Sequence, residues 1–258
     1  MKVRLKTKEE LVTMREGGRR HAAILAELAS RVAPGISTLT LEEEALRLIR
    51  EYGDRPAHLG YTPRGASRPF PAALCLSIND EIVHGIPNEN IRVLKDGDII
   101  SIDLSLEHEG LITDSAVTVG CGVLSDESKK LLEVTREALV RGIEKAISGN
   151  TTGDIGYAIS KVVRSTDFSL AEGLAGHGVG FEIHEEPLVP NFGEEGSGTR
   201  LVLGMVLAIE PMVNIGSGEI KESRDGYTIL TLDGSRSAHF EHTVAITEKG
   251  NIILTSND

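Results

Sequence analysis

Tryptophan is absent from this 258-residue chain, and aromatic residues make up only 3% of it. The sequence therefore lacks the aromatic platforms on which single-stranded nucleic acids stack. Its two cysteines, without a CxxC pair, exclude a disulfide framework. No window approaches the ~18 apolar residues of a membrane span, and the N-terminal MKVRLKTKEEL has no apolar core of the signal-peptide kind. We therefore expect a cytoplasmic protein with no membrane association.

Basic residues are in deficit, because 27 Lys and Arg stand against 39 Asp and Glu for a net charge of −12. This balance argues against nucleic-acid binding as the main function, since long-range attraction to phosphate needs the opposite sign. Hydrophobic residues (40%) and charged residues (26%) are in the proportions typical of a folded globular protein.

Helical patterns occur in two pairs. A capping box over 7–10 predicts the start of the first helix, and a similar box over 40–43 predicts a second that ends at Gly53. Two further helices are predicted to begin at Ser125 and at Asp154, each followed by apolar residues at helical spacing. A proline-rich stretch between the first pair and the first strand, over 54–73, predicts a long loop of the kind that often carries function.

Strand-like apolar runs follow each helix pair. They cover 74–78, 98–106, 111–119, 174–181, 207–214, 227–232 and 237–247. The order helix, helix, strands thus occurs twice, with the break near residue 122. We expect residues 1–258 to form one α+β domain of two similar halves, with four helices on one face of a mostly antiparallel sheet.

Two aspartates stand out in the hairpin predicted between the second and third runs. If the turn is centred in Glu107–Gly110, Asp103 and Asp114 face each other across the two strands. Like charges directly opposed are destabilising, and buried unpaired carboxylates cost more. A cation between them resolves the conflict. A register slip of one residue would instead turn one aspartate toward solvent, and the hairpin alone leaves both readings open.

Further candidates lie in the second half. His177 and His184 occur in AGHGVGFEIHEEP, whose glycines argue against a helix and permit close backbone approach. Glu210 and Glu241 interrupt strand-like apolar runs that contain no base, so either they meet a cation or they form salt bridges to distant residues. His84, in NDEIVHGIP, carries little information by itself.

Four carboxylates with one or two histidines favour Mn, Fe, Co or Zn over a thiolate-type structural zinc. Four carboxylates are also enough to bridge two ions, a recurring device for hydrolysis by an activated water.

Six segments together resemble methionine aminopeptidase, type I, of the bacterial kind. They are SINDEIVHGIPN, DGDIISIDLS, TDSAVTVG, AGHGVGFEIHEEP, AIEPMVN and FEHTVAIT. The resemblance covers about residues 3–255 in order and spacing. It implies the pita-bread fold, an α+β domain with a pseudo-two-fold axis, antiparallel sheet and four helices. It implies metal ligands at five positions: Asp103, Asp114, His177, Glu210 and Glu241.

The resemblance also implies roles within the site. Asp103 with one ion would hold the free amine of the substrate, His177 and Glu210 would hold the other ion, and Asp114 and Glu241 would bridge both. Glu210 is the expected proton shuttle for the attacking water. His184 would polarise the carbonyl oxygen or stabilise the oxyanion, and His84 would position the peptide near the scissile nitrogen.

The expected methionine pocket includes Cys75, Phe70 and Tyr227, with Phe70 standing where the family pattern has tyrosine and Tyr227 where many bacterial members have tryptophan. The loop before Cys75 is also more basic and proline-rich than the family pattern.

The implied activity is removal of the N-terminal methionine from nascent polypeptides whose second residue is small. The cofactor would be two divalent ions per chain, drawn from Co, Mn, Fe or Zn. The nascent-chain substrate implies a transient encounter with the ribosome, and the family expectation is a monomer. Two alternatives remain at this stage: an Xaa-Pro aminopeptidase on the same fold, which usually carries an additional N-terminal domain, and a non-catalytic binding relative.

Overall fold

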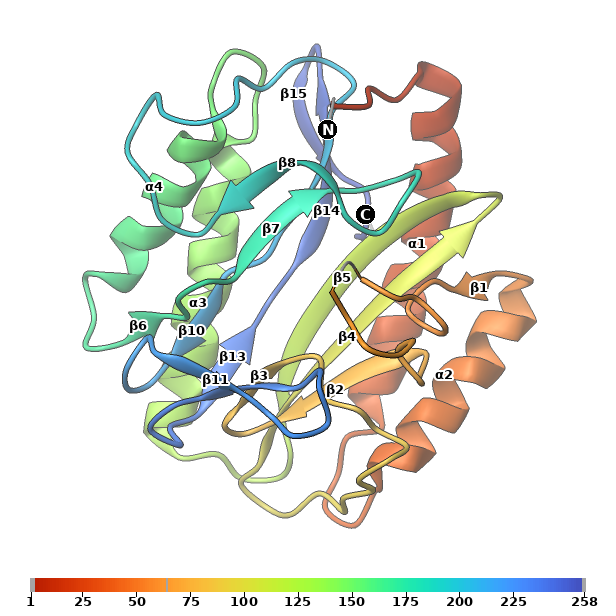
Figure 1. The fold of residues 1–258 in the computed structure, drawn as a ribbon, viewed down its shortest axis with the longest axis vertical. Helices are drawn as coiled ribbons and strands as arrows, with labels where there is room; N and C mark the ends of the chain where they lie inside the picture. Colours follow the sequence, from red (N-terminus) through yellow and green to blue (C-terminus); the bar gives the residue numbers. More distant parts are fainter. Residues whose placement is uncertain (1–2, 64, 257–258) are drawn as a thin grey trace.

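The computed structural model of this protein describes residues 3–63 and 65–256. In the view of Figure 1, one pair of helices lies to the right of the strands and the other pair to the left. The helices are α1 (Lys8–Ser30), α2 (Thr38–Tyr52), α3 (Asp126–Lys145) and α4 (Thr152–Val163). No helix of the described part is both long and apolar enough to cross a membrane. The predicted four helices are confirmed.

Side-chain caps fix where the first pair of helices begins. The predicted box at the start of α1 is confirmed, because Thr7 Oγ1 accepts the Glu10 amide at 3.2 Å and Glu10 accepts the Thr7 amide at 2.7 Å. The box predicted over 40–43 is wrong by three residues, since the Ser37 hydroxyl accepts the Thr40 amide and α2 starts at position 38. Gly53 ends α2 as predicted, with a left-handed φ of 73°.

The second pair of helices shows one similar correction. Ser125 caps α3 as predicted. Asp154 was predicted to cap α4, but the N-cap is Thr151, and Asp154 occupies the third helical position of its capping box. The Asp154 side chain still accepts a free amide at the helix start. The pattern therefore located the capping box correctly but named Asp154, not Thr151, as the N-cap.

Every pair of strands in the described residues runs antiparallel. The strands are β1 (Arg55–Pro56), β2 (Leu74–Ile78), β3 (Glu81–Val83), β4 (Ile99–His108), β5 (Leu111–Gly120), β6 (Ser169–Leu170), β7 (Ala175–Gly178), β8 (Glu185–Pro190), β9 (Val206–Ile209), β10 (Met212–Asn214), β11 (Ile220–Glu222), β12 (Ile229–Thr231), β13 (Ser237–His239), β14 (His242–Thr247) and β15 (Gly250–Ile253). They form four sheets: β1 and β2 with β4 and β5; β13-β10-β6; β11-β12-β3; and β15-β14-β9-β7-β8.

The hairpin of β4 and β5 differs from its predicted register by two residues. Asp103 pairs with Ala116, and Asp114 pairs with Ser105. The turn has only two residues, 109–110, both with positive φ (50° and 81°), as a tight hairpin of this twist requires. Because a shift of two preserves the face on which a side chain lies, both aspartates still point to the same side of the sheet.

The two long runs predicted near the C-terminal end are each broken once. The run 207–214 divides into β9 and β10 at Glu210-Pro211, where proline has no amide to donate to a ladder. The run 237–247 divides into β13 and β14, and at this break the Glu241 amide donates to the Ala116 carbonyl of β5 at 3.0 Å. Each glutamate therefore lies at a junction between sheets, not inside a strand as predicted.

Two large apolar clusters form the core. One joins α1 and α2 to β2 and β4, and the other joins α3 and α4 to β9 and β14. Val117 of β5 packs against both clusters, so this strand lies between the halves of the molecule. That residues 1–258 make up a single domain stays a prediction.

Candidate metal centre and substrate pocket

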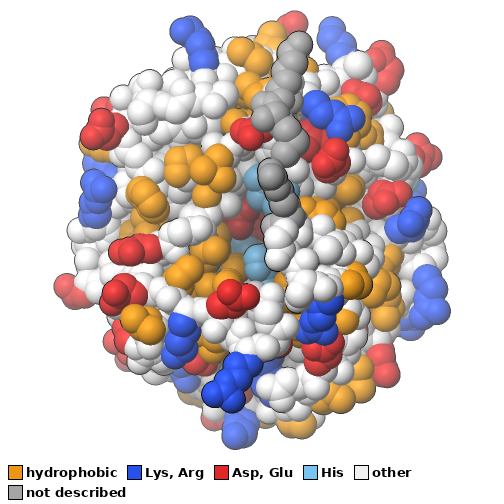
Figure 2. All heavy atoms as spheres, in the orientation of Figure 1, with side chains coloured by type: hydrophobic (Ala, Val, Ile, Leu, Met, Phe, Trp, Pro, Cys, Tyr) orange, Lys and Arg blue, Asp and Glu red, His pale blue; other side chains and the backbone are white. Residues whose placement is uncertain are grey.

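A cavity of about 390 Å³ receives side chains from both halves of the chain. Figure 2 shows a hollow on this face with histidine and acidic side chains at its base. All ten residues expected to form a site line the cavity: Phe70, Cys75, His84, Asp103, Asp114, His177, His184, Glu210, Tyr227 and Glu241. The fold thus brings them together, while their individual roles stay predictions.

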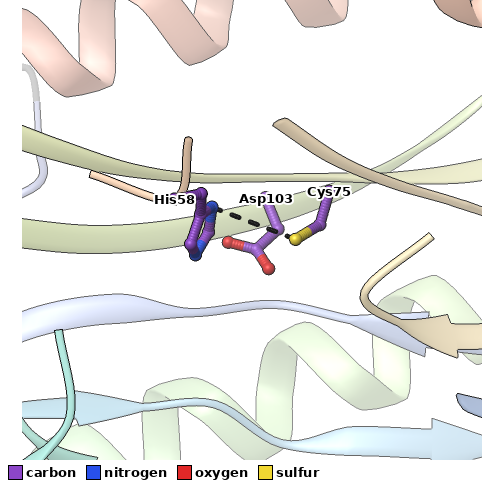
Figure 3. Close-up of side chains that lie close together, drawn as sticks. All are labelled: His58, Cys75 and Asp103. Carbon is purple, nitrogen blue, oxygen red and sulfur yellow. Dashed lines mark hydrogen bonds between the residues drawn. The ribbon is translucent and has the colours of Figure 1, made fainter. Parts of the chain in front are cut away.

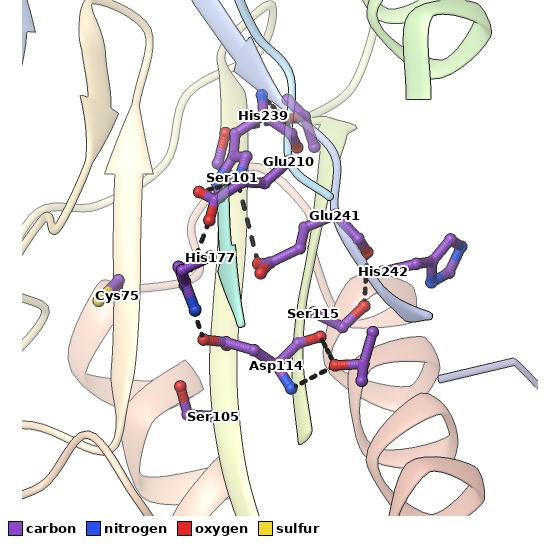
Figure 4. A network of polar contacts seen from close by, with 12 residues as sticks. Cys75, Ser101, Ser105, Asp114, Ser115, His177, Glu210, His239, Glu241 and His242 are labelled. Carbon is purple, nitrogen blue, oxygen red and sulfur yellow. Dashed lines mark hydrogen bonds and ion pairs between the residues drawn. The ribbon is translucent and has the colours of Figure 1, made fainter. Parts of the chain in front are cut away.

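The five ligand-type residues come from five separate strands or strand ends. Asp103 lies on β4, Asp114 on β5 and His177 on β7, whereas Glu210 and Glu241 follow β9 and β13. His177 Nε2 lies 3.3 Å from Glu210 Oε1 and 3.9 Å from Asp114 Oδ2 (Figure 4). Single ligand atoms of Asp114, His177 and Glu241 all lie within 4.8 Å of one another.

Hydrogen bonds from threonine and serine fix the backbone beneath two of these carboxylates. Thr243 on β14 accepts the Asp114 amide at 2.8 Å and donates to the Asp114 carbonyl at 2.7 Å. Ser115 donates to the Glu241 carbonyl at 2.7 Å. These bonds join β5 to β14 and to the β13–β14 junction, so the spacing of the two carboxylates is set by side-chain to main-chain hydrogen bonds between sheets (Figure 4).

The glycines that flank His177 are required by close packing. A Cβ on Gly176 would lie 2.3 Å from the Ala208 carbonyl oxygen, and a Cβ on Gly178 would lie 2.3 Å from that of Glu186. Only glycine fits at either position, which agrees with the close backbone approach expected from the sequence. The His177 ring is therefore carried into the cavity on a strand packed tightly on both edges.

The electrostatics of the cavity favour a cation. Burial, followed by mutual repulsion, raises the pKa of Asp103, Glu210 and Glu241 well above the usual range of carboxyl groups. Burial raises the pKa of Asp114 to about 7. Within the described residues, Asp114 Oδ1 and Glu241 Oε1 are buried without a hydrogen-bond partner. Buried carboxylate oxygens without partners are costly, and a divalent ion would satisfy them.

The loop between β7 and β8 carries His184, and Glu185 fixes its shape. The amide of Phe181 donates to Glu185 Oε1 at 2.6 Å, and Lys6 Nζ donates to the other carboxylate oxygen at 2.6 Å in an ion pair almost fully buried. His184 Nδ1 lies 2.8 Å from the hydroxyl of Tyr61. Burial lowers the pKa of His184, so the ring is held neutral near pH 7.

An apolar wall lies beside the polar part of the cavity. It belongs to a cluster of Phe70, Ala72, Cys75, Ile86 and Tyr227, of which Phe70, Cys75 and Tyr227 line the cavity. The rings of Phe70 and Tyr227 meet edge to face with centroids 5.1 Å apart. His84 borders this wall with a left-handed φ of 60°, and burial lowers its pKa to about 4. The wall is soft and without charge, as an unbranched thioether side chain requires.

Among the histidines and tyrosines that line the cavity, three were not found by sequence reasoning: His58, Tyr61 and His239. The first two lie in the loop 54–73, which was expected to be functional, yet no pattern within it distinguished them. His239 had a usable signal, because it stands two positions before Glu241 and alternation in a strand places both on one face. Its Nε2 lies 3.6 Å from Glu210 Oε2 and 3.9 Å from Glu241 Oε2.

Comparisons with known proteins agree over nearly the whole chain. The model of metallopeptidase family M24 matches residues 12–248. Methionine aminopeptidase 1 of Bacillus subtilis (strain 168) is 48% identical over 250 residues, which cover 97% of this chain and 98% of the relative. The crystal structure of methionine aminopeptidase from Thermotoga maritima has a TM-score of 0.94 at 40% identity and covers 99% of this chain and 100% of its own. An Xaa-Pro dipeptidase from Bacillus anthracis shows a shared fold alone, with a TM-score of 0.74 at 21% identity, and this chain spans 62% of it.

Proposed function

We propose that this chain, which belongs to metallopeptidase family M24, removes the N-terminal methionine from polypeptides whose second residue is small. The observation that carries the proposal is the match to a methionine aminopeptidase at 48% identity over 97% of the chain. The cavity supports it independently, because a cluster of buried carboxylates stands beside an apolar wall. The pita-bread fold of the family is present in full, as the structural match over 99% of the chain indicates.

The residues present fit two divalent ions. Asp103 would hold one ion, His177 and Glu210 the other, and Asp114 and Glu241 both. The fit rests on the partnerless oxygens of Asp114 and Glu241 and on the donor set, which is rich in oxygen with a single imidazole. Such a set suits Co, Mn, Fe or Zn. When bound, two ions would acidify a water molecule and fix the free amine of the substrate.

The protein's own side chains supply the remaining chemistry. Glu210 faces His177 inside the cavity, where its carboxylate would accept a proton from the attacking water and pass it to the leaving nitrogen. His184 would donate to the carbonyl oxygen as negative charge develops there. His84 would contact the peptide near the scissile nitrogen. The wall of Cys75, Phe70 and Tyr227 would receive the methionine side chain.

The proposed substrate indicates the cellular location of the protein and the partner that it meets there. Polypeptides with a free N-terminal methionine arise at translating ribosomes, so we propose a cytoplasmic location, a transient encounter with the ribosome, and action as a monomer. No part of this proposal requires nucleic-acid recognition.

A peptide panel tests the proposal against its nearest rival. Met-Ala-Ser should be cleaved much faster than Met-Leu-Ser, because the second side chain would point toward the crowded cluster near His84. An N-formyl or N-acetyl group should block cleavage by removing the free amine. Leu-Ala-Ser should be cleaved about 10–200-fold more slowly than Met-Ala-Ser, the range set by a methylene-scale difference in an apolar pocket. Preferred cleavage of Ala-Pro-Ser would instead establish the Xaa-Pro alternative, and no cleavage of any peptide by metal-loaded protein would support a binding relative.

A further inference from the structure

A second group of metal-ligating side chains lies at the apolar end of the cavity. His58 from the loop after β1, Cys75 on β2 and Asp103 on β4 converge there (Figure 3). Single ligand atoms of the three residues all lie within 4.8 Å of one another, and His58 Nδ1 lies 3.9 Å from Cys75 Sγ. The backbone fixes Cys75 and Asp103 beside each other, because they are direct partners in the β2–β4 ladder.

A hydrogen-bond contact at Nε2 of His58 leaves Nδ1 as the ring nitrogen available to bind a metal. The hydroxyl of Ser105 lies 2.8 Å from His58 Nε2, within hydrogen-bonding distance. When Nε2 carries the ring proton and donates it to this hydroxyl oxygen, Nδ1 is left unprotonated. The lone pair of the neutral ring then lies on Nδ1, the nitrogen that faces Cys75. A hydrogen bond that fixes the other ring nitrogen is the usual arrangement of histidines that bind metals.

The separation of the donors matches a small tetrahedral ion. With metal–sulfur and metal–nitrogen bonds of about 2.3 and 2.0 Å, tetrahedral coordination puts the two donor atoms about 3.5 Å apart. The 3.9 Å between Cys75 Sγ and His58 Nδ1 is within a small side-chain shift of that value. Asp103 is shared with the five residues proposed to hold the catalytic ions, which contain no sulfur. Cys75 adds a thiolate to the group, a donor that prefers softer ions.

We propose that His58 Nδ1, Cys75 Sγ and one oxygen of Asp103 form a third, thiophilic site for a single Zn²⁺ or Cd²⁺ ion. The Cys75 thiol loses its proton to solvent as the metal–sulfur bond forms. The fourth coordination position faces the cavity. Because Cys75 is part of the apolar wall, an ion here occupies space that the proposed function assigns to the methionine side chain. Excess Zn²⁺ or Cd²⁺ therefore inhibits in competition with the peptide; this consequence rests on the proposed function, whereas the site itself does not.

Cadmium titration of the manganese-loaded full-length protein tests the site by spectroscopy. Cd²⁺ should produce one equivalent of the ultraviolet thiolate-to-cadmium charge-transfer band, and Cys75→Ser should abolish it. Cys121→Ser is the matched control, because Cys121 is also buried and free but packs in the apolar core beside Leu94 and Val119, so this variant should keep the full band. His58→Phe, which leaves the thiol in place, should weaken Cd²⁺ binding by at least about tenfold, at the low end of what ligand-shell changes cost.

Some outcomes would overturn the site. A band that survives in Cys75→Ser, or one lost equally in Cys121→Ser, would place the cadmium elsewhere. Unchanged Cd²⁺ affinity in His58→Phe would show that His58 is not a ligand and that the cadmium binds the thiol of Cys75 without it. Retained Mn²⁺ binding shows in each case that the variant is folded. Peptide assays at rising Zn²⁺ test the inhibition, each variant being compared with its own rate without zinc. If the protein cleaves no peptide, the proposed function fails while the charge-transfer band still decides the site.

Discussion

Replacement of His184 by alanine should lower kcat by ~10²–10³, the usual effect of losing one donor to an oxyanion. The ring lines the cavity, and its centroid lies 4.4 Å from that of His177, so it is close to the ligand residues without being needed among them. The expected loss corresponds to about 3–4 kcal/mol of transition-state stabilisation. Metal content should stay unchanged, because five other residues supply the ligands.

The contact with Tyr61 gives a second, graded perturbation of the same group. The hydroxyl lies 2.8 Å from His184 Nδ1, and a hydroxyl that donates there leaves the ring proton on Nε2. Tyr61→Phe removes only this hydrogen bond while keeping the ring, whose centroid lies 5.5 Å from that of His184. One hydrogen bond contributes about 1 kcal/mol net, so kcat should fall only about fivefold.

The assay is steady-state cleavage of Met-Ala-Ser at saturating metal, with elemental analysis of each variant. Tyr157→Phe on α4 controls for the loss of a tyrosine hydroxyl outside the cavity and should leave kcat unchanged. Loss of one metal equivalent in His184→Ala would refute the reasoning, since it would make His184 a ligand. A Tyr61→Phe defect as large as that of His184→Ala would show that the hydroxyl, not the imidazole, is the oxyanion donor.

Three further predictions follow from the same geometry. Chelation should abolish peptide cleavage, and added Co, Mn or Fe should restore it. Asp114→Ala or Glu241→Ala should weaken metal binding most, because each removes a ligand expected to be shared by both ions. Full activity in protein shown by elemental analysis to be free of metal would contradict the requirement for metal. Lys6→Met should lower the free energy of unfolding by about 3–5 kcal/mol because it leaves Glu185 buried without its cation, whereas Arg4→Met, which loses an exposed pair with Glu182, should cost under about 1 kcal/mol in the same urea titration. Burial lowers the pKa of His21 from 6.5 to about 3, so between these pH values the unfolded chain binds a proton that the folded chain does not, and stability present above pH 6.5 is lost as the pH falls. With chelator present throughout, the free energy of unfolding of the wild-type protein should fall by about 1 kcal/mol more than that of His21→Gln between pH 6.5 and 5.5. Equal losses in the two proteins would show that His21 is protonated in the folded state.

Local patterns in the sequence were sufficient to predict the four helices. Each helix start is a short-range event in which a hydroxyl or carboxylate satisfies an amide two or three residues away, and such events leave a signature in adjacent residues. The errors at Thr40 and Asp154 were of one kind: a neighbouring residue of the capping type was chosen. They moved a boundary by three residues and left each helix in place.

The hairpin shows why a partly wrong strand prediction still found the aspartates. The register was off by two residues, but side chains alternate with a period of two, so Asp103 and Asp114 kept a common face. Their convergence was therefore predictable from sequence, while their offset across the ladder was decided by the turn at 109–110.

The breaks at Glu210 and Glu241 could not be located from the sequence. Both lie in apolar runs that locally resemble continuous strands, and only the sheets on either side show where each run changes partner. At these junctions the backbone leaves one ladder and enters another, so a carboxylate can turn into the cavity. The proline after Glu210 was the one local sign of a break.

The sequence by itself determined the element types, the antiparallel α+β class, and which residue types are available as ligands, because capping, periodicity and residue type are local properties. Tertiary structure alone decided that residues as far apart as Asp103 and Glu241 share one cavity, and that His58, from a loop without periodic pattern, meets Cys75 and Asp103. The physical reason is that long-range contacts are set by which sheets and clusters pack together, and packing depends on the sum of many apolar contacts that no single segment encodes.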